Sequence, residues 1–219
     1  RASAEDIVMT TRLSGTPAAV DQVHLGETLQ LAPGDTHTVS YGFTLNEPAE
    51  VILDPQLVGA NGDTDFYWEL LSLDDIVQDG DVGTSDSDLR TITLAAGSYV
   101  LNVHQSGTGS LALKLLDAAS ATKVKPDQPV DAVLAPGATQ AFVFNAISGS
   151  TLRYSPGALA GLSGHWTLLD PYGDVAQTGD LSSAIDLNIR ETGRYLLLCE
   201  ADAANAADAT AFTFSITDG

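Results

Sequence analysis

Apolar and polar residues alternate with a period of two in short runs along most of the chain. In residues 39–45, Val, Tyr, Phe and Leu occupy alternate positions, and Ser, Gly and Thr lie between them. The same alternation recurs in further runs: 66–70, 99–103, 111–115, 142–146, 166–168, 185–189, 195–199 and 212–216. This period is typical of β-strands that bury one face and expose the other to solvent. We therefore expect an all-β protein.

Residues that favour turns separate these runs. Pro-Gly occurs at 33–34 and at 136–137, Asn-Gly at 61–62 and Asp-Gly at 79–80. Their backbone preferences suit tight connections between strands. The alanine-rich run at 201–209 is the one candidate helix, and we interpret it as a lengthened hairpin loop. Many short strands with such turns predict antiparallel β-sandwiches of the jelly-roll or immunoglobulin-like kind.

The chain contains the same module twice. The sequence Leu-Ala-Pro-Gly-Asp-Thr at 31–36 returns about 100 residues later as Leu-Ala-Pro-Gly-Ala-Thr at 134–139. A repeat of this length is too long for a solenoid unit and suits an independent domain with its own core. We predict two tandem sandwiches, residues 1–117 with a lead-in segment at 1–20, and residues 118–219.

Aromatic residues at matching positions of the two copies are expected to pack in the two cores. These residues are Trp68, Trp166, Tyr99 and Tyr195. Cys199 has the same parity as Tyr195 in its predicted strand, so we expect a small core residue there and not a nucleophile. A single cysteine forms no intrachain disulfide.

The charge balance restricts the partners of the protein. The chain has 29 acidic and 9 basic residues, which gives a formal net charge of −20. Such a charge repels nucleic acid and anionic membranes and favours cations, and it also serves solubility in salt or outside the cell. No run approaches the ~20 apolar residues that cross a bilayer, and the N-terminus has no signal-peptide pattern. We expect a monomeric segment of a longer protein, without membrane insertion.

Two motifs of the first copy indicate a family. They are Gly-Asp-Thr-Asp-Phe-Tyr-Trp at 62–68 and Thr-Leu-Ala-Ala-Gly-Ser-Tyr-Val-Leu-Asn-Val at 93–103. With the strand that precedes them, they resemble the bacterial pre-peptidase C-terminal (PPC) domain family, over most of the first copy. The second copy keeps the closing hairpin at 190–195, but glycine and serine replace the two aspartates of the first motif.

The resemblance implies an extracellular bacterial setting and a non-catalytic role. Modules of this family accompany secreted peptidases and other exoenzymes or form arrays on surface proteins, and relatives bind calcium or fibrous substrates such as collagen. We expect a pair of binding or spacer modules of a secreted or cell-surface protein. Its expected partners are other domains of the same protein and a glycan or extracellular matrix polymer. A carbohydrate- or matrix-binding adhesin module and a purely structural stalk are the alternatives.

An acidic stretch at residues 74–88 offers candidate ligands for calcium. Calcium takes six to eight oxygen ligands from carboxylates and carbonyls, and a flexible loop with two glycines suits it. The order of residues does not match an EF-hand, because no glutamate stands at its twelfth position. A solvated turn between strands is the alternative interpretation. The candidate ligands are Asp63, Asp65, Asp74, Asp75, Asp79, Asp81, Asp86 and Asp88.

No motif of the sequence predicts catalysis. The chain lacks Gly-x-Ser-x-Gly, His-Glu-x-x-His and a phosphate loop. Nothing in the spacing of the four histidines indicates a catalytic triad, so we expect no enzyme. Tyr67 and Tyr172 are the candidate ligand-binding residues, because an exposed aromatic ring can stack on a sugar or insert into a partner.

Overall fold

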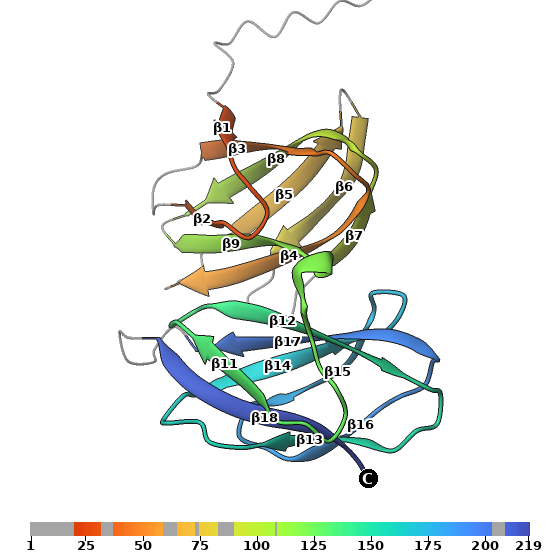
Figure 1. Cartoon of the computed structure of the whole chain (residues 1–219). Helices are drawn as coiled ribbons and strands as arrows, with labels where there is room; N and C mark the ends of the chain where they lie inside the picture. Colours follow the sequence, from red (N-terminus) through yellow and green to blue (C-terminus); the bar gives the residue numbers. More distant parts are fainter. Residues whose placement is uncertain are drawn as a thin grey trace, which may run out of the picture.

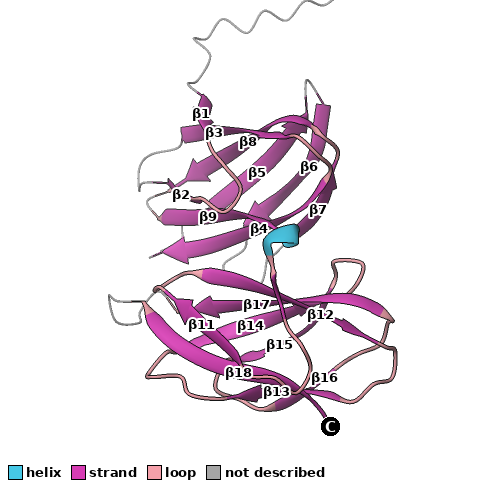
Figure 2. Cartoon of the chain, in the orientation of Figure 1, coloured by secondary structure: helices cyan, strands magenta, loops and turns pink. Residues whose placement is uncertain are grey.

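The computed structural model describes residues 20–31, 37–58, 65–72, 75–82, 90–107, 109–202 and 209–219 (Figure 1). In this part of the chain the elements are β-strands and one short 3-10 helix, η1 (Ala118–Ser120) (Figure 2). No helix among these residues is long and apolar enough to span a membrane. The fold class is all-β, as the alternation predicts.

The first sandwich consists of a five-stranded and a four-stranded sheet. The larger sheet has the order β1 (Val20–Gln22), β3 (His37–Leu45), β8 (Gly97–Ser106), β5 (Asp65–Ser72) and β6 (Asp75–Val82). The smaller sheet has the order β2 (Thr28–Leu31), β9 (Ser110–Asp117), β4 (Ala49–Val58) and β7 (Arg90–Leu94). All pairs are antiparallel except β1 with β3.

The second sandwich repeats this strand order. Its larger sheet runs β10 (Thr122–Lys123), β12 (Thr139–Ala146), β17 (Gly193–Ala201), β14 (Gly164–Leu169) and β15 (Val175–Asp180). Its smaller sheet runs β11 (Val130–Leu134), β18 (Thr210–Asp218), β13 (Leu152–Pro156) and β16 (Ile185–Leu187). Each strand has its counterpart in the first sandwich, and even the single parallel pair recurs, as β10 with β12. The duplication seen in the sequence is thus a duplication of topology. The exact domain limits, 1–117 and 118–219, stay a prediction.

Each sandwich has its own core, in which the matching aromatic residues are buried. Trp68 is 2% exposed and Trp166 is fully buried. The hydroxyl of Tyr99 donates a hydrogen bond to the Ala95 carbonyl. In the same way, the hydroxyl of Tyr195 donates to the carbonyl of Glu191, four residues earlier in the chain. Cys199 is buried in the second core, as expected, and burial raises the pKa of its thiol. The residues that the alternating pattern predicts to face inward are therefore buried in the two cores.

A third apolar cluster joins the two sandwiches. The smaller sheet of the first lies against the larger sheet of the second (Figure 1). The residues of this interface patch, which point away from both cores, are Ile52, Leu116, Ala118, Ala141, Leu169, Leu196 and Leu198. Sequence reasoning did not anticipate this contact. The two sandwiches pack directly against each other through a buried apolar surface and are not joined by a linker alone.

Candidate functional site

The outer face of the larger sheet of the first sandwich is polar over much of its area, with Leu71, Ile76 and Val100 at one end. Inward side chains such as Trp68 and Leu70 build the core, so their neighbours on each strand point outward. We call this surface the polar face. Its members are Thr38 and Ser40 on β3, Asn102 and His104 on β8, Tyr67 and Glu69 on β5, and Asp79 and Asp81 on β6. The face collects groups from the consecutive strands β5 and β6 and from β3 and β8, which are more distant in the sequence.

His104 occupies the centre of a hydrogen-bonded line on the polar face. Its Nδ1 lies 2.8 Å from the Thr38 hydroxyl oxygen, and its Nε2 lies 3.2 Å from a carboxylate oxygen of Glu69. Beside this line, the Ser40 hydroxyl donates to the side-chain carbonyl of Asn102 at 2.7 Å. The contacts with Thr38 and Glu69 fix the plane of the imidazole ring, and the His104 side chain is 38% exposed. The sequence could not predict this hydrogen-bonded line, because the line depends on the register between β3, β8 and β5.

Tyr67 stands next to His104 on the same face. The two rings lie 5.7 Å apart between centroids. The Tyr67 hydroxyl donates a hydrogen bond to Asp79 at 2.7 Å. This bond is the main reason that the pKa of Tyr67 rises to about 12, and the charges of nearby carboxylates, Glu69 and Asp81 among them, add to it. Tyr67 therefore remains a neutral hydrogen-bond donor, and the residue is partly exposed to solvent.

The acidic stretch is largely a strand and not a flexible loop. Residues 75–82 form β6, which pairs with β5 along its whole length. Asp79 and Asp81 lie opposite Glu69 and Tyr67, so the alternation of polar groups follows the pleat of the sheet. The interpretation of this segment as a bendable loop is therefore wrong for residues 75–82.

The structure describes only some of the eight aspartates predicted as calcium ligands. Asp65 and Asp79 are on strands of the polar face, and Asp75 lies opposite Ser72, where only its backbone is described. Asp63, Asp74, Asp86 and Asp88 fall outside the described residues. Among the described residues, no three His, Cys, Asp or Glu side chains are grouped so that they would hold a metal ion. The described acids alone do not form a cation site, and calcium remains a prediction that depends on the other four.

Tyr172 lies on a different surface from Tyr67. It is 77% exposed, in the turn between β14 and β15 of the second sandwich. The Asp170 carboxylate shapes this turn by accepting hydrogen bonds from the backbone N–H groups of Tyr172 and Asp174. The structure therefore does not bring the two candidate tyrosines together into one site.

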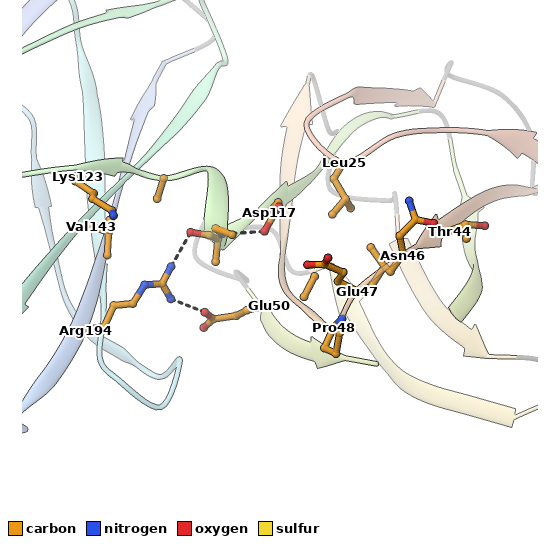
Figure 3. A pocket seen from close by; sticks show the side chains of 15 residues that line it. Leu25, Thr44, Asn46, Glu47, Pro48, Glu50, Asp117, Lys123, Val143 and Arg194 are labelled. Carbon is orange, nitrogen blue, oxygen red and sulfur yellow. Dashed lines mark hydrogen bonds and ion pairs between the residues drawn. The ribbon is translucent and has the colours of Figure 1, made fainter. Parts of the chain in front are cut away.

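A groove of about 570 Å³ opens at the junction of the two sandwiches (Figure 3). Arg194 reaches across it from β17, and its guanidinium donates to Glu50 and to the Ala118 carbonyl, both at 2.6 Å. Lys123 and Asp117 add one charge of each sign to the lining. Arg194 is already engaged with Glu50 and the Ala118 carbonyl, so the groove forms a polar rim beside the interface patch.

Searches with the sequence find no matching family model and no matching curated protein. Several solved structures are similar to this chain, with low sequence identity and low TM-scores. The pre-peptidase C-terminal domain of a collagenase from Bacillus anthracis matches at 19% identity and a TM-score of 0.39, over 46% of this chain and 98% of that one. The CUB1-EGF-CUB2 region of human MASP-1/3 matches at 8% identity and a TM-score of 0.27, over 88% and 100% of the two chains. The M60 catalytic domain with its CBM51-1 and CBM51-2 domains, from Clostridium perfringens ZmpB, matches at 8% identity and a TM-score of 0.27, over 87% and 34%.

Proposed function

We propose that the chain is a non-catalytic binding module whose polar face recognises a neutral, hydroxyl-rich polymer such as a glycan. The proposed setting is outside a bacterial cell, in a secreted or surface protein, with the chain acting as a monomer next to other domains. The observation that supports this most is the ordered pair of rings, Tyr67 and His104, on an open sheet face.

The chemistry of the polar face suits a ligand with many hydroxyl groups. An aromatic ring offers a flat apolar surface together with a polar edge, which matches the two sides of a sugar ring. Glu69 and Asp79 accept hydrogen bonds, and the Tyr67 and Thr38 hydroxyls also take part in the network. The net charge of −20 disfavours acidic polymers, so a neutral one is expected.

One arrangement favours a second candidate function. Thr38, His104 and Glu69 stand in the order hydroxyl, imidazole and carboxylate, as in hydrolytic triads. The ring nitrogens are exchanged relative to the serine-protease triad, because the hydroxyl lies at Nδ1 and the carboxylate at Nε2. We propose that Thr38 and Glu69 orient the His104 ring for ligand binding and not for catalysis. A catalytic triad also needs a substrate pocket and hydrogen-bond donors for the developing oxyanion. Hydrolysis of a chromogenic ester that disappears in Thr38→Ala would favour catalysis instead.

Replacing Tyr67 by alanine should weaken glycan binding by about tenfold or more, because central aromatic contacts dominate recognition surfaces. Affinity electrophoresis in gels cast with neutral polysaccharides measures the change, after a glycan array has identified a binding polymer. Tyr172→Ala is the matched control and should retain affinity, since Tyr172 lies on another surface. A silent array, or loss of binding in Tyr172→Ala alone, would contradict the assignment of the polar face.

We propose calcium as a cofactor of the first module, on the strength of its aspartate-rich sequence. A site with the millimolar to submillimolar affinity of extracellular modules should stabilise the fold by about 1–3 kcal/mol at 10 mM calcium. Differential scanning calorimetry with calcium, magnesium or a chelator shows this as a higher melting temperature in calcium alone. Asp63→Asn should remove the shift, whereas Asp131→Asn, an exposed acid of the second module, should keep it. Equal melting temperatures in calcium and chelator would exclude the cofactor.

A further inference from the structure

Ionisable side chains from both sandwiches meet beside the interface patch. Asp54 on β4 is fully buried, and Glu200 on β17 is only 7% exposed. Lys114 on β9 donates its Nζ hydrogen to the Thr139 carbonyl of the second sandwich at 3.0 Å. His165 on β14 pairs with Glu200 at 3.2 Å. Two carboxyl groups thus lie near each other within a mostly buried contact.

The buried Asp54 carboxyl has the Thr139 side chain as a hydrogen-bonding neighbour and Lys114 opposite it on β9, but it is poorly satisfied. Neither of its oxygens accepts a hydrogen bond of standard geometry. Burial is the largest cause that raises the pKa of Asp54, and the negative charge of Glu200 raises it further. The Thr139 side chain, Lys114 and His165 act in the opposite direction. The balance leaves the pKa of Asp54 at about 7 in place of an ordinary 3.8.

Two further charged groups of the interface, Arg194 and Glu50, neutralise each other at the rim of the junction groove. Lys114 and His165 are engaged with Thr139 and Glu200. Ionisation of Asp54 within the contact is therefore costly, because its carboxylate and that of Glu200 would then share a largely dry environment.

We propose that the two sandwiches dock in a pH-dependent manner, tightly while Asp54 holds a proton and more weakly once it is ionised. Asp54 points away from the core of its own sandwich, so undocking exposes it to water and restores its ordinary acidity. Between pH values of about 4 and 7, the docked state keeps a proton that the undocked state has released. Docking is therefore strongest below this window, weakens as the pH rises through it, and levels off above it.

A cysteine at the interface measures docking directly. Ala141 belongs to the interface patch, so the thiol of Ala141→Cys reacts with an alkylating reagent only when the sandwiches separate. Cys199, buried in the second core, provides an internal marker of unfolding. Rates are divided by those of a free thiol at each pH. The corrected rate at position 141 should rise by up to about tenfold per pH unit between pH 5 and 7, and then level off. The rate at Cys199 should rise less.

Two variants make the result specific to Asp54. Asp54→Asn keeps the shape and removes the titration, so the corrected rate at position 141 should become independent of pH. Asp131→Asn, at an exposed position of β11 outside the interface, should retain the dependence of the parent. A flat profile in the parent, or a profile that persists unchanged in Asp54→Asn, would overturn the proposal. A parallel rise at Cys199 would also overturn it, because the pH would then be acting on folding.

Discussion

Leu198→Asp should separate the two sandwiches while both remain folded. Leu198 is 2% exposed and lies in the interface patch, between Ala141 on β12 and Thr167 on β14. Its removal forfeits about 1.5–3 kcal/mol of apolar burial. The new carboxylate would also be desolvated near Glu200 and Asp54, which adds several kcal/mol against docking. Neither core loses a residue, since the side chain points away from the second core.

Small-angle X-ray scattering measures this separation as a larger radius of gyration, and circular dichroism checks that the β structure persists. Asn102→Asp is the matched control. Asn102 holds the corresponding place on β8 in the first sandwich, where the outer face is open, so the same charge should leave the scattering unchanged. An unaltered radius for Leu198→Asp, or loss of its β structure, would show that the patch is not a separable docking surface.

Trp166→Ala should destabilise the second sandwich by about 3–5 kcal/mol, because it removes a fully buried indole from a packed core. The ring lies 5.4 Å from that of Tyr154 and covers Gly179 on the neighbouring strand. The space left behind cannot be filled by a glycine. We expect the first sandwich to retain its own core, in which Trp68 plays the equivalent part.

The variant brings its own probe, since the chain has two tryptophans and Trp68 then becomes the only one. In a urea titration, circular dichroism should show an early transition of the second sandwich, followed by a later one. Trp68 fluorescence should follow the later transition alone. Trp68→Ala should reverse the order, with Trp166 as the reporter. Coincident transitions by both probes would mean that the chain unfolds as one cooperative unit, which a strong interface patch would produce.

The strands and cores were predictable because each depends on a local rule. A strand with one wet face shows its period in the sequence, as residues 39–45 and 66–70 do. The matching positions of Trp68 and Trp166 then locate the two cores, because a core aromatic retains its place when a module is duplicated. The repeat also predicts that both halves have one strand order, which the sheets confirm.

The interface and the polar face depend on contacts that no local rule contains. Leu196 and Leu198 interrupt the alternation around Tyr195, and a strand that is apolar on both sides is a signal of burial on both faces. The signal was present, but nothing nearby in the sequence indicates what covers the second face. The line from Thr38 to Glu69 requires the register of β3, β8 and β5, which only the folded sheet sets. The aspartates of β6 disfavour a strand by propensity, and pairing with β5 overrides them.

The interface patch joins the smaller sheet of the first sandwich to the larger sheet of the second. The matching outer faces of the other two sheets differ from these two in composition. Where the second module presents Leu198 and Ala141 to the first, the first has Asn102 and Ser40. Leu196 and Leu169 correspond to Val100 and Leu71, so the outer face of the first module is only partly polar at these positions. Where the first module presents Ile52 and Asp54, the second has Arg153 and Ser155 on its smaller sheet. A further copy of this module, stacked in the same way on either side, would meet a face that is more polar than the interface patch. The more polar character of these outer faces therefore disfavours extension of the same contact by a third module.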